Sequence, residues 1–332
     1  MLALVVGLVA LALVFNFLNG MNDAANSIAT VVSTRVLTPR LAVAWAAFFN
    51  LVAPFLFGVN VASTIGTGVV VPSIVTPMML LAVLVSSIVW THVCTRAGLP
   101  ISVSHALVGA LVGAGLVKAG PDCLVVSGLA KIMIFIVLAP LIGLALGAAL
   151  IIAVMWVCRR AAPGPVDRWF RRLQLVSAAL YSLGHGANDA QKTMGIIAVL
   201  LFSTGYLGGS FFVPVWVILA CGAAISLGTL AGGWKVIETL GMRMTKMQPI
   251  HGFCAETAAA ASILMSTVGG IPVSTTHTIT GSIIGVGLPT RLGAIRWGIA
   301  YRIVWAWILT IPASALFAAA TWWLISLAGL AD

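Results

Sequence analysis

The nine residues N-G-M-N-D-A-A-N-S at positions 19–27 recur in altered form as H-G-A-N-D-A-Q-K-T at positions 185–193. A second motif, G-L-P-I-S-V-S-H at 98–105, recurs as G-I-P-V-S-T-T-H at 270–277. The two pairs have the same order and offsets of 166 and 172 residues, which indicates a duplicated chain. All four motifs lie in apolar stretches, where polar residues are costly and mark binding or permeation sites. Duplication with polar interruptions at matching positions is typical of secondary transporters.

Composition places the chain in a membrane. It is 61% hydrophobic and 7% charged, with a mean hydropathy of +1.15, which excludes an ordinary soluble domain. The net charge of +10 does not predict nucleic-acid binding, because the basic residues lie between apolar runs, where they orient membrane proteins. The first apolar run has no basic start and no cleavage pattern, so we expect a retained helix. The five cysteines are scattered without a C-x-x-C motif, and we expect buried thiols and no cofactor.

The sequence predicts an all-α integral membrane protein with ten membrane-embedded helical elements, five in each half. A spanning helix needs about 20 apolar residues. The predicted elements are residues 1–34, 41–61, 77–95, 101–117, 131–158, 173–203, 211–232, 250–268, 273–288 and 297–327. Gly20 and Gly186 permit an interrupted backbone, so helix breaks are predicted at 19–26 and 185–193. The elements at 101–117 and 273–288 are short, and re-entrant hairpins are the alternative there.

The basic residues predict the orientation of these elements. With the N-terminus outside, the inside segments carry most of the lysines and arginines, and the outside segments carry only Lys118 and Lys131. Five crossings in each half is an odd number, so the second half is inserted upside down. We therefore expect two inverted repeats, residues 1–158 and 173–332, joined by a basic cytoplasmic linker at 159–172. The expected location is the cell membrane, as a multi-pass protein of a bacterial inner membrane.

Three of the seven acids, Asp23, Asp189 and Glu256, lie in apolar surroundings. A carboxylate inside a membrane has to be paired, hydrogen-bonded or protonated. We expect the equivalent residues Asp23 and Asp189 to bind the coupling cation, as ligands of a metal ion if it is Na⁺ or as proton carriers. Asn26 and Gln191 can supply amide oxygens to the same cation. Glu256 has no clear first-half counterpart, and a coupling or a structural role is open. The alternative is that these groups only join helices by hydrogen bonds.

The second motif pair predicts an oxyanion site. In both copies a proline is followed by hydroxyl residues and then by an apolar, glycine-containing helix. A hydroxyl there can cap the helix, whose N-terminus offers free N–H groups and partial positive charge. Two such helix starts that face each other would surround a tetrahedral anion. The residues expected to bind it are Ser102, Ser104, Ser274, Thr275, Thr276, Asn22, Asn188 and Lys192. For any single hydroxyl, plain helix capping is an equal alternative.

Histidines accompany the motifs. His105 and His277 are equivalent residues that directly follow the two hydroxyl clusters, and His185 lies in the second Asn-Asp motif. We expect a proton or hydrogen-bond relay from them, with satisfied structural histidines as the alternative. Lys192 is the one basic group placed to meet an anion or to neutralise Asp189, and its first-half counterpart is Asn26.

At these residues the sequence resembles the inorganic phosphate transporter family, the PiT family. The resemblance rests on N-G-M-N-D-A-A-N-S-I-A-T at 19–30, G-H-G-A-N-D-A-Q-K at 184–192 and the two proline-hydroxyl-histidine motifs, and it covers the whole chain. It implies a compact bacterial secondary active transporter that imports phosphate with Na⁺ or H⁺ and forms a homodimer. It also implies that the two aspartates serve the cation and the Ser/Thr stretches serve phosphate. Met21 departs from the family's G-A-N-D form.

Other functions are less favoured. A sulfate or other tetrahedral oxyanion transporter of the same fold is the nearest alternative. A passive channel would not need buried acids at matching positions. An intramembrane enzyme is not expected, because Ser104 and His105 are adjacent on a helix and do not face each other. The expected partners are therefore phosphate, a coupling cation, the lipid bilayer and a second copy of the chain, without nucleic acid.

Overall fold

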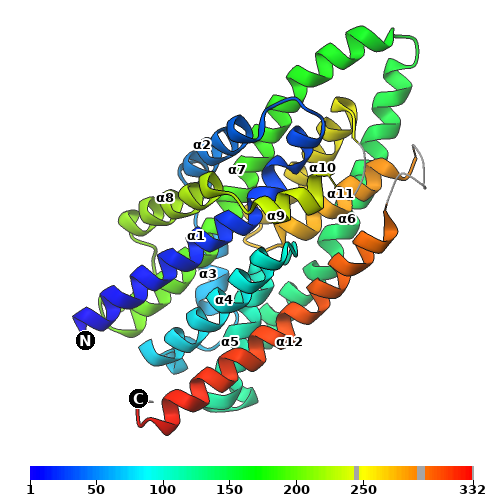
Figure 1. Ribbon diagram of the computed structural model, residues 1–332. Helices are drawn as coiled ribbons and strands as arrows, with labels where there is room; N and C mark the ends of the chain where they lie inside the picture. Colours follow the sequence, from blue (N-terminus) through cyan, green and yellow to red (C-terminus); the bar gives the residue numbers. More distant parts are fainter. Residues whose placement is uncertain (243–246, 290–295, 331–332) are drawn as a thin grey trace.

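The computed structural model describes residues 1–242, 247–289 and 296–330, and it is built of α-helices (Figure 1). The helices are α1 Leu2–Ser33, α2 Pro39–Leu56, α3 Asn60–Thr67, α4 Pro77–Ala97, α5 Val103–Ala119, α6 Val126–Cys158, α7 Pro163–Ser203, α8 Val215–Ala231, α9 Trp234–Ile237, α10 Pro249–Val268, α11 Thr275–Gly287 and α12 Trp297–Leu327. Nine of the ten predicted elements each correspond to one of these helices, and the tenth, 41–61, covers most of α2 and the start of α3. The all-α prediction is therefore confirmed.

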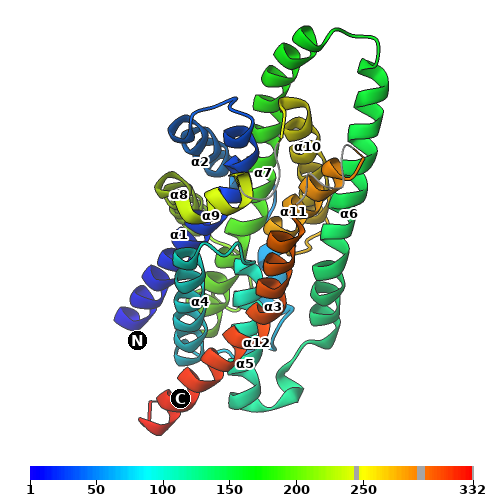
Figure 2. The ribbon, with the colours of Figure 1, turned by 45° about the vertical axis from the view of Figure 1, so that its right-hand side comes forward.

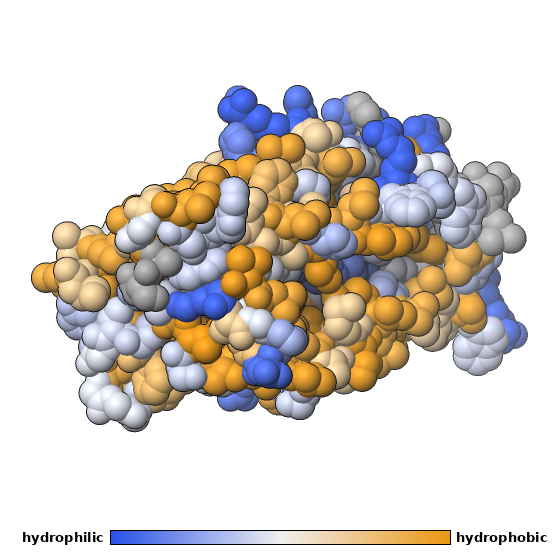
Figure 3. Space-filling view, turned by 90° about the horizontal axis from the view of Figure 1, so that it is seen from below, coloured by the Kyte–Doolittle hydropathy of each residue, from blue (hydrophilic) through white to orange (hydrophobic). Residues whose placement is uncertain are grey.

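Five of the described helices, α1, α2, α4, α6 and α12, are long and apolar enough to cross a membrane. A sixth span arises if α8 and the short helical segment after it, bent by 67° from one another, count as one. Hydrophobic side chains cover most of the middle of the face in Figure 3, and strongly hydrophilic ones gather toward its edges. The exposed large hydrophobic residues come mainly from the long helices, as expected for a surface in contact with lipid.

The predicted helix breaks at 19–26 and 185–193 are wrong, because α1 and α7 run through both motifs without interruption. The glycines serve close packing instead. A Cβ on Gly20 would overlap the carbonyl oxygen of Ile225 in α8, and a Cβ on Gly186 would lie 2.8 Å from Cα of Asn50 in α2. Polar side chains in these motifs therefore find partners on neighbouring helices while their own backbone remains helical.

Two other boundaries differ from the prediction. The run at 41–61 is divided, because α2 ends at Leu56 and α3 begins at Asn60. The connector predicted at 159–172 is mostly helical, since α7 already begins at Pro163. Pro163 and Pro165 lie in the first turn of α7, where a backbone N–H has no partner within the helix and proline is therefore tolerated. Of the inside basic residues, Arg243, Lys246 and Arg291 lie outside the described residues.

The two short helices of the second motif pair are held by long helices from the other half. Helix α5 packs on α12, and α11 packs on α6. A Cβ on Gly113 of α5 would overlap the carbonyl oxygen of Ala315, and a Cβ on Gly285 of α11 would overlap that of Leu144. Small residues at a four-residue spacing allow such close contact between helices in membranes. The helices α5 and α11 have 17 and 13 residues, about 25 and 20 Å at roughly 1.5 Å per residue, so both are short for a bilayer.

The polar motifs lie between two apolar clusters. One cluster includes Val5 to Phe15 of α1 and the C-terminal part of α7, and the other includes Ala25 to Val31 of α1 and the N-terminal part of α7. Figures 1 and 2 show α1 and α7 beside each other in the middle of the bundle. The buried polar residues of both helices therefore form a layer inside the protein, with apolar packing on either side.

Candidate functional site

The two aspartates predicted to bind a cation lie together. Asp23 on α1 and Asp189 on α7 are fully buried, and ligand atoms of these carboxylates and of His185 all lie within 4.8 Å of one another. Two carboxylates enclosed in protein repel each other, and cations or hydrogen-bond donors must offset that repulsion. The described residues provide such groups on both sides of the pair.

Thr275 and His185 contact the Oδ2 atoms of both aspartates. Thr275 Oγ1 lies 3.4 Å from Asp23 Oδ2 and 3.2 Å from Asp189 Oδ2. His185 Nε2 lies 3.8 Å and 3.3 Å from the same two oxygens. The other ring nitrogen of His185 lies 3.1 Å from Asn50 Oδ1 on α2, which holds the ring in place. One hydroxyl and one imidazole thus bridge the two carboxylates at the centre of the site.

Lys192 pairs with Asp189 one helical turn along α7. Its Nζ lies 2.5 Å from Asp189 Oδ1, donates to Ser104 Oγ on α5 and donates to the carbonyl oxygen of Val273 at 2.9 Å. The lysine side chain is fully buried. A buried ammonium is tolerated only when it is paired and hydrogen-bonded, and these three oxygens use all three of its N–H groups.

The Oδ1 atom of Asp23 has a different neighbour. Thr276 Oγ1 lies 3.3 Å from Asp23 Oδ1, donates to the carbonyl oxygen of Ile101 at 3.1 Å and accepts from Asn26 Nδ2 at 2.9 Å. The side-chain oxygen of Asn26 is buried and has no hydrogen-bond partner among the described residues. Four oxygen-bearing groups therefore gather at Asp23 Oδ1, and no lysine or arginine in the described part of the chain bonds to them.

The starts of α5 and α11 meet at this layer, as the motif pair predicts. Ser102 accepts from the backbone N–H of His105, and Ser274 accepts from that of His277, so both serines cap their helices. The rings of His105 and His277 lie 4.5 Å apart at a steep angle, and Trp307 stacks on His277 at 3.7 Å. Within the described residues, no hydrogen bond or ion pair joins His105 or His277 to the aspartates, whereas His185 contacts both carboxylates. Helix starts carry partial positive charge, so two of them close together suit an anion.

The asparagines of the first motif pair make matching bonds. Asn22 Nδ2 donates to Thr95 Oγ1 at 2.8 Å, and Asn188 Nδ2 donates to Thr267 Oγ1 at 3.0 Å. Asn188 Oδ1 also accepts from the backbone N–H of Val273 at 3.3 Å. These amides therefore position the chain that leads into the helix starts of α5 and α11.

Two predicted cation-coupling residues lie apart from the aspartates. Gln191 Oε1 accepts from the backbone N–H groups of Val61 and Ala62 at 2.9 and 3.3 Å, in the first turn of α3. Glu256 on α10 accepts from Thr30, from Ser177 at 2.5 Å and from Gln174 at 3.0 Å. No hydrogen bond or ion pair among the described residues joins either side chain to the two aspartates. The three partners of Glu256 were not predicted, because Gln174 and Ser177 lie outside both motif pairs and Thr30, the last residue of the motif at 19–30, has no feature that points to Glu256.

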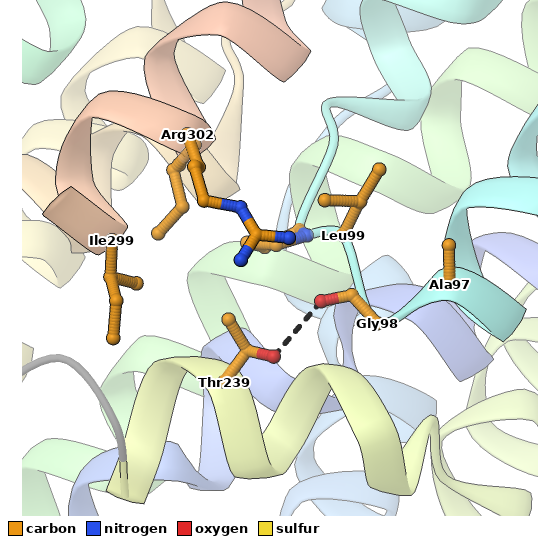
Figure 4. Close-up of a pocket in the computed structure, with 8 residues that line it drawn as sticks. Ala97, Gly98, Leu99, Thr239, Ile299 and Arg302 are labelled. Carbon is orange, nitrogen blue, oxygen red and sulfur yellow. Dashed lines mark hydrogen bonds between the residues drawn. The ribbon is translucent and has the colours of Figure 1, made fainter.

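A cavity of about 110 Å³ lies beside the loop that connects α4 to α5. Figure 4 shows Arg302 reaching from α12 over Leu99, and Thr239 closing the other side by donating to the carbonyl oxygen of Gly98 at 2.9 Å. The loop continues within a few residues to Ser102 at the start of α5. A guanidinium therefore lies next to the segment that leads to one half of the predicted oxyanion site.

Comparisons with known proteins agree on the family. Residues 19–165 and 159–318 match the phosphate transporter family. A Rhizobium meliloti (strain 1021) protein named "Probable low-affinity inorganic phosphate transporter" is 58% identical over 95% of each chain. A Bacillus subtilis (strain 168) protein of the same name is 39% identical over 98% of each chain. A solved structure described as "The sodium-dependent phosphate transporter" is 26% identical with a TM-score of 0.86, covering 98% of this chain and 99% of that one. These names describe transport and not catalysis, and the chain therefore belongs to the phosphate transporter family.

Proposed function

We propose that this protein imports inorganic phosphate across the bacterial cell membrane by symport with a monovalent cation, Na⁺ or H⁺. The observation that carries this proposal is the buried aspartate pair next to the starts of α5 and α11. A cation at the carboxylates reduces their negative charge, and an anion then binds at the adjacent helix starts. Neither ion binds well without the other, because the carboxylates alone would repel phosphate. This mutual dependence is the physical basis of coupling.

The substrate follows from the site together with the relatives. Ser104, Thr275 and Thr276 place hydroxyl groups close to both helix starts, and Lys192 adds a positive charge. Hydroxyl and N–H donors recognise a tetrahedral oxyanion, and the curated relatives are named for inorganic phosphate. The name of the related solved structure supports Na⁺ as the coupling ion.

We infer that the two halves are inverted repeats that rock against each other in alternating access. Matching contacts support this inference: Asn22 to Thr95 corresponds to Asn188 to Thr267, and α5 on α12 corresponds to α11 on α6. The start of α1 and the end of α12 lie at one end of the bundle, and the connection between α6 and α7 lies at the other (Figures 1 and 2). The first half thus begins at one end of the bundle and the second half at the other, as inversion requires. The homodimer stays a prediction, which light scattering of the purified protein tests.

Uptake into proteoliposomes tests the proposed function. Purified protein is reconstituted, a Na⁺ or H⁺ gradient is imposed, and radioactive phosphate uptake is measured with sulfate as competitor. Uptake that follows one cation gradient and is not inhibited by sulfate supports phosphate symport and identifies the cation. Uptake of sulfate in place of phosphate would overturn the substrate, and uptake independent of both gradients would overturn the coupling.

A further inference from the structure

The two halves of the site share one arrangement of oxygen atoms. In one half, the Lys192 ammonium donates to three oxygens: Asp189 Oδ1, Ser104 Oγ and the carbonyl oxygen of Val273. Around Asp23 Oδ1 lie Thr276 Oγ1 and the carbonyl oxygen of Ile101. The members correspond by the offsets of the motifs, since Asp189 follows Asp23 by 166 residues, and Thr276 and Val273 follow Ser104 and Ile101 by 172. Each half therefore contributes a carboxylate, a hydroxyl and a backbone carbonyl.

The same offset makes Lys192 the counterpart of Asn26, and this is where the halves differ. In the second half the Lys192 ammonium lies among the three oxygens and donates to each of them. In the first half Asn26 only donates to Thr276, and its own oxygen is buried and unpartnered. A carboxylate, a hydroxyl, a carbonyl and an amide oxygen form the set that a hard cation such as Na⁺ accepts, and no described lysine or arginine bonds to them.

We propose that the Lys192 ammonium takes the place of a bound cation in the second half, which leaves one exchangeable cation site, formed by Asp23, Thr276, Asn26 and the carbonyl of Ile101. The ammonium brings one positive charge and three donors to oxygens that would otherwise coordinate a metal ion. It is covalently attached, so it neutralises Asp189 in every conformation of the cycle and is never released. This inference rests on the proposed function only in that the site carries a cation during transport.

The other titratable group at the site is His185, and it occupies neither the position of Lys192 nor the proposed cation position at Asp23 Oδ1. His185 approaches the Oδ2 atoms of the two aspartates, whereas Lys192 and Thr276 approach the Oδ1 atoms. With the imidazole of His185 neutral, the two carboxylates and the one lysine leave a single negative charge, and one exchangeable monovalent cation neutralises it.

Counting bound Na⁺ ions tests the proposal without any transport. We would measure binding of radioactive Na⁺ to the purified full chain for the wild type, for Lys192→Asn, which introduces the first-half residue, and for Lys192→Arg, which keeps the charge. Lys192→Asn is expected to bind one Na⁺ per chain more than the wild type, and Lys192→Arg is expected to bind no more than the wild type. A folded Lys192→Asn protein that binds no additional Na⁺ would overturn the proposal.

A second variant keeps the test decisive if Lys192→Asn does not fold. Asn26→Lys places an ammonium at the first-half position as well, so phosphate binding, measured by calorimetry, should lose the cation dependence that the wild type shows. Retention of the wild-type cation dependence by Asn26→Lys would contradict the proposal. An extra Na⁺ in Lys192→Asn together with no phosphate uptake by the wild type would instead refute the proposed function alone. Phosphate uptake by the wild type without the extra Na⁺ would refute this inference alone.

Discussion

Lys192 and Asp189 form a buried ion pair on one face of α7, with Nζ 2.5 Å from Oδ1 and both side chains almost inaccessible. Burying two charges is costly, and removing one partner is worse, because the remaining charge is then uncompensated. Removing either residue should therefore lower the free energy of unfolding much more than breaking an exposed ion pair would. This difference predicts how the protein responds when the lysine is replaced.

Lys192→Met should lower the free energy of unfolding by about 3–5 kcal/mol, the usual effect of leaving a buried carboxylate unpaired. Methionine retains the length of the side chain but offers no N–H group and no metal ligand suited to Na⁺. Arg171→Met is the matched control on the same helix, since Arg171 pairs with Asp167 at 2.8 Å and both are about half exposed. There the expected loss is about 0–1 kcal/mol. Equal losses in denaturant unfolding of the two variants would contradict the prediction.

Asp189→Asn should abolish cation-driven phosphate uptake and leave a folded, membrane-inserted protein. The amide retains the size of the carboxylate and its contact distance to Thr275, but it removes the negative charge that holds Lys192. Uptake into proteoliposomes under a cation gradient, compared with the amount of protein recovered in membranes, measures the effect. Normal coupled uptake in this variant would remove the aspartate from the mechanism.

Thr275→Val should weaken cation-dependent phosphate binding by about 10- to 100-fold. Its hydroxyl contacts both carboxylates, and hydrogen bonds to charged groups contribute roughly 1.5–3 kcal/mol. Thr278→Val is the control one turn further along α11, because its hydroxyl only donates to the backbone carbonyl of Ser274. We expect binding by the control to change less than about threefold. Calorimetric titration with phosphate at fixed cation concentration would compare the two, and equal effects would show that Thr275 has no special place at the site.

Much of the site could be predicted from the sequence because it is duplicated. The matching offsets of Asp23 with Asp189 and of Ser104 with Thr276 indicate one shared site, and the structure places the two aspartates together, with Thr276 at Asp23 and Ser104 joined to Asp189 through Lys192. Apolar run lengths were sufficient to place ten helical elements, since a helix in a membrane must satisfy its own backbone. Local pattern and global duplication point to the same arrangement.

What the sequence did not predict depends on contacts between distant segments. A glycine beside polar residues is compatible with a helix break or with close packing, and only the position of Ile225 distinguishes the two at Gly20. Gln191 lies next to Asn188 and Lys192 along the chain, yet its oxygen is directed at α3. The partners of Glu256 come from two helices, Thr30 from α1 and Gln174 and Ser177 from α7, and the two partners on α7 belong to no motif. No repeat or spacing in the sequence indicates which of these distant segments come into contact.

The packing role of Gly20 can be separated from the chemistry of its neighbours. Gly20→Ala should lower the free energy of unfolding by about 1–3 kcal/mol, because the added Cβ would overlap the carbonyl oxygen of Ile225 and must push α1 away from α8. Asp23 lies on the same helix, so phosphate uptake should fall as well. Gly7→Ala is the matched control on α1, since a Cβ there meets nothing within 4 Å.

At Gly7 alanine should be neutral, or stabilising by up to about 1 kcal/mol, because glycine inside a helix carries an entropic cost that alanine does not. Denaturant unfolding of both variants in the same detergent, with uptake measured in parallel, distinguishes packing from propensity. If Gly20→Ala were as stable and as active as Gly7→Ala, the close contact between α1 and α8 would not be needed. In that case the glycine would need an explanation other than its close packing against Ile225.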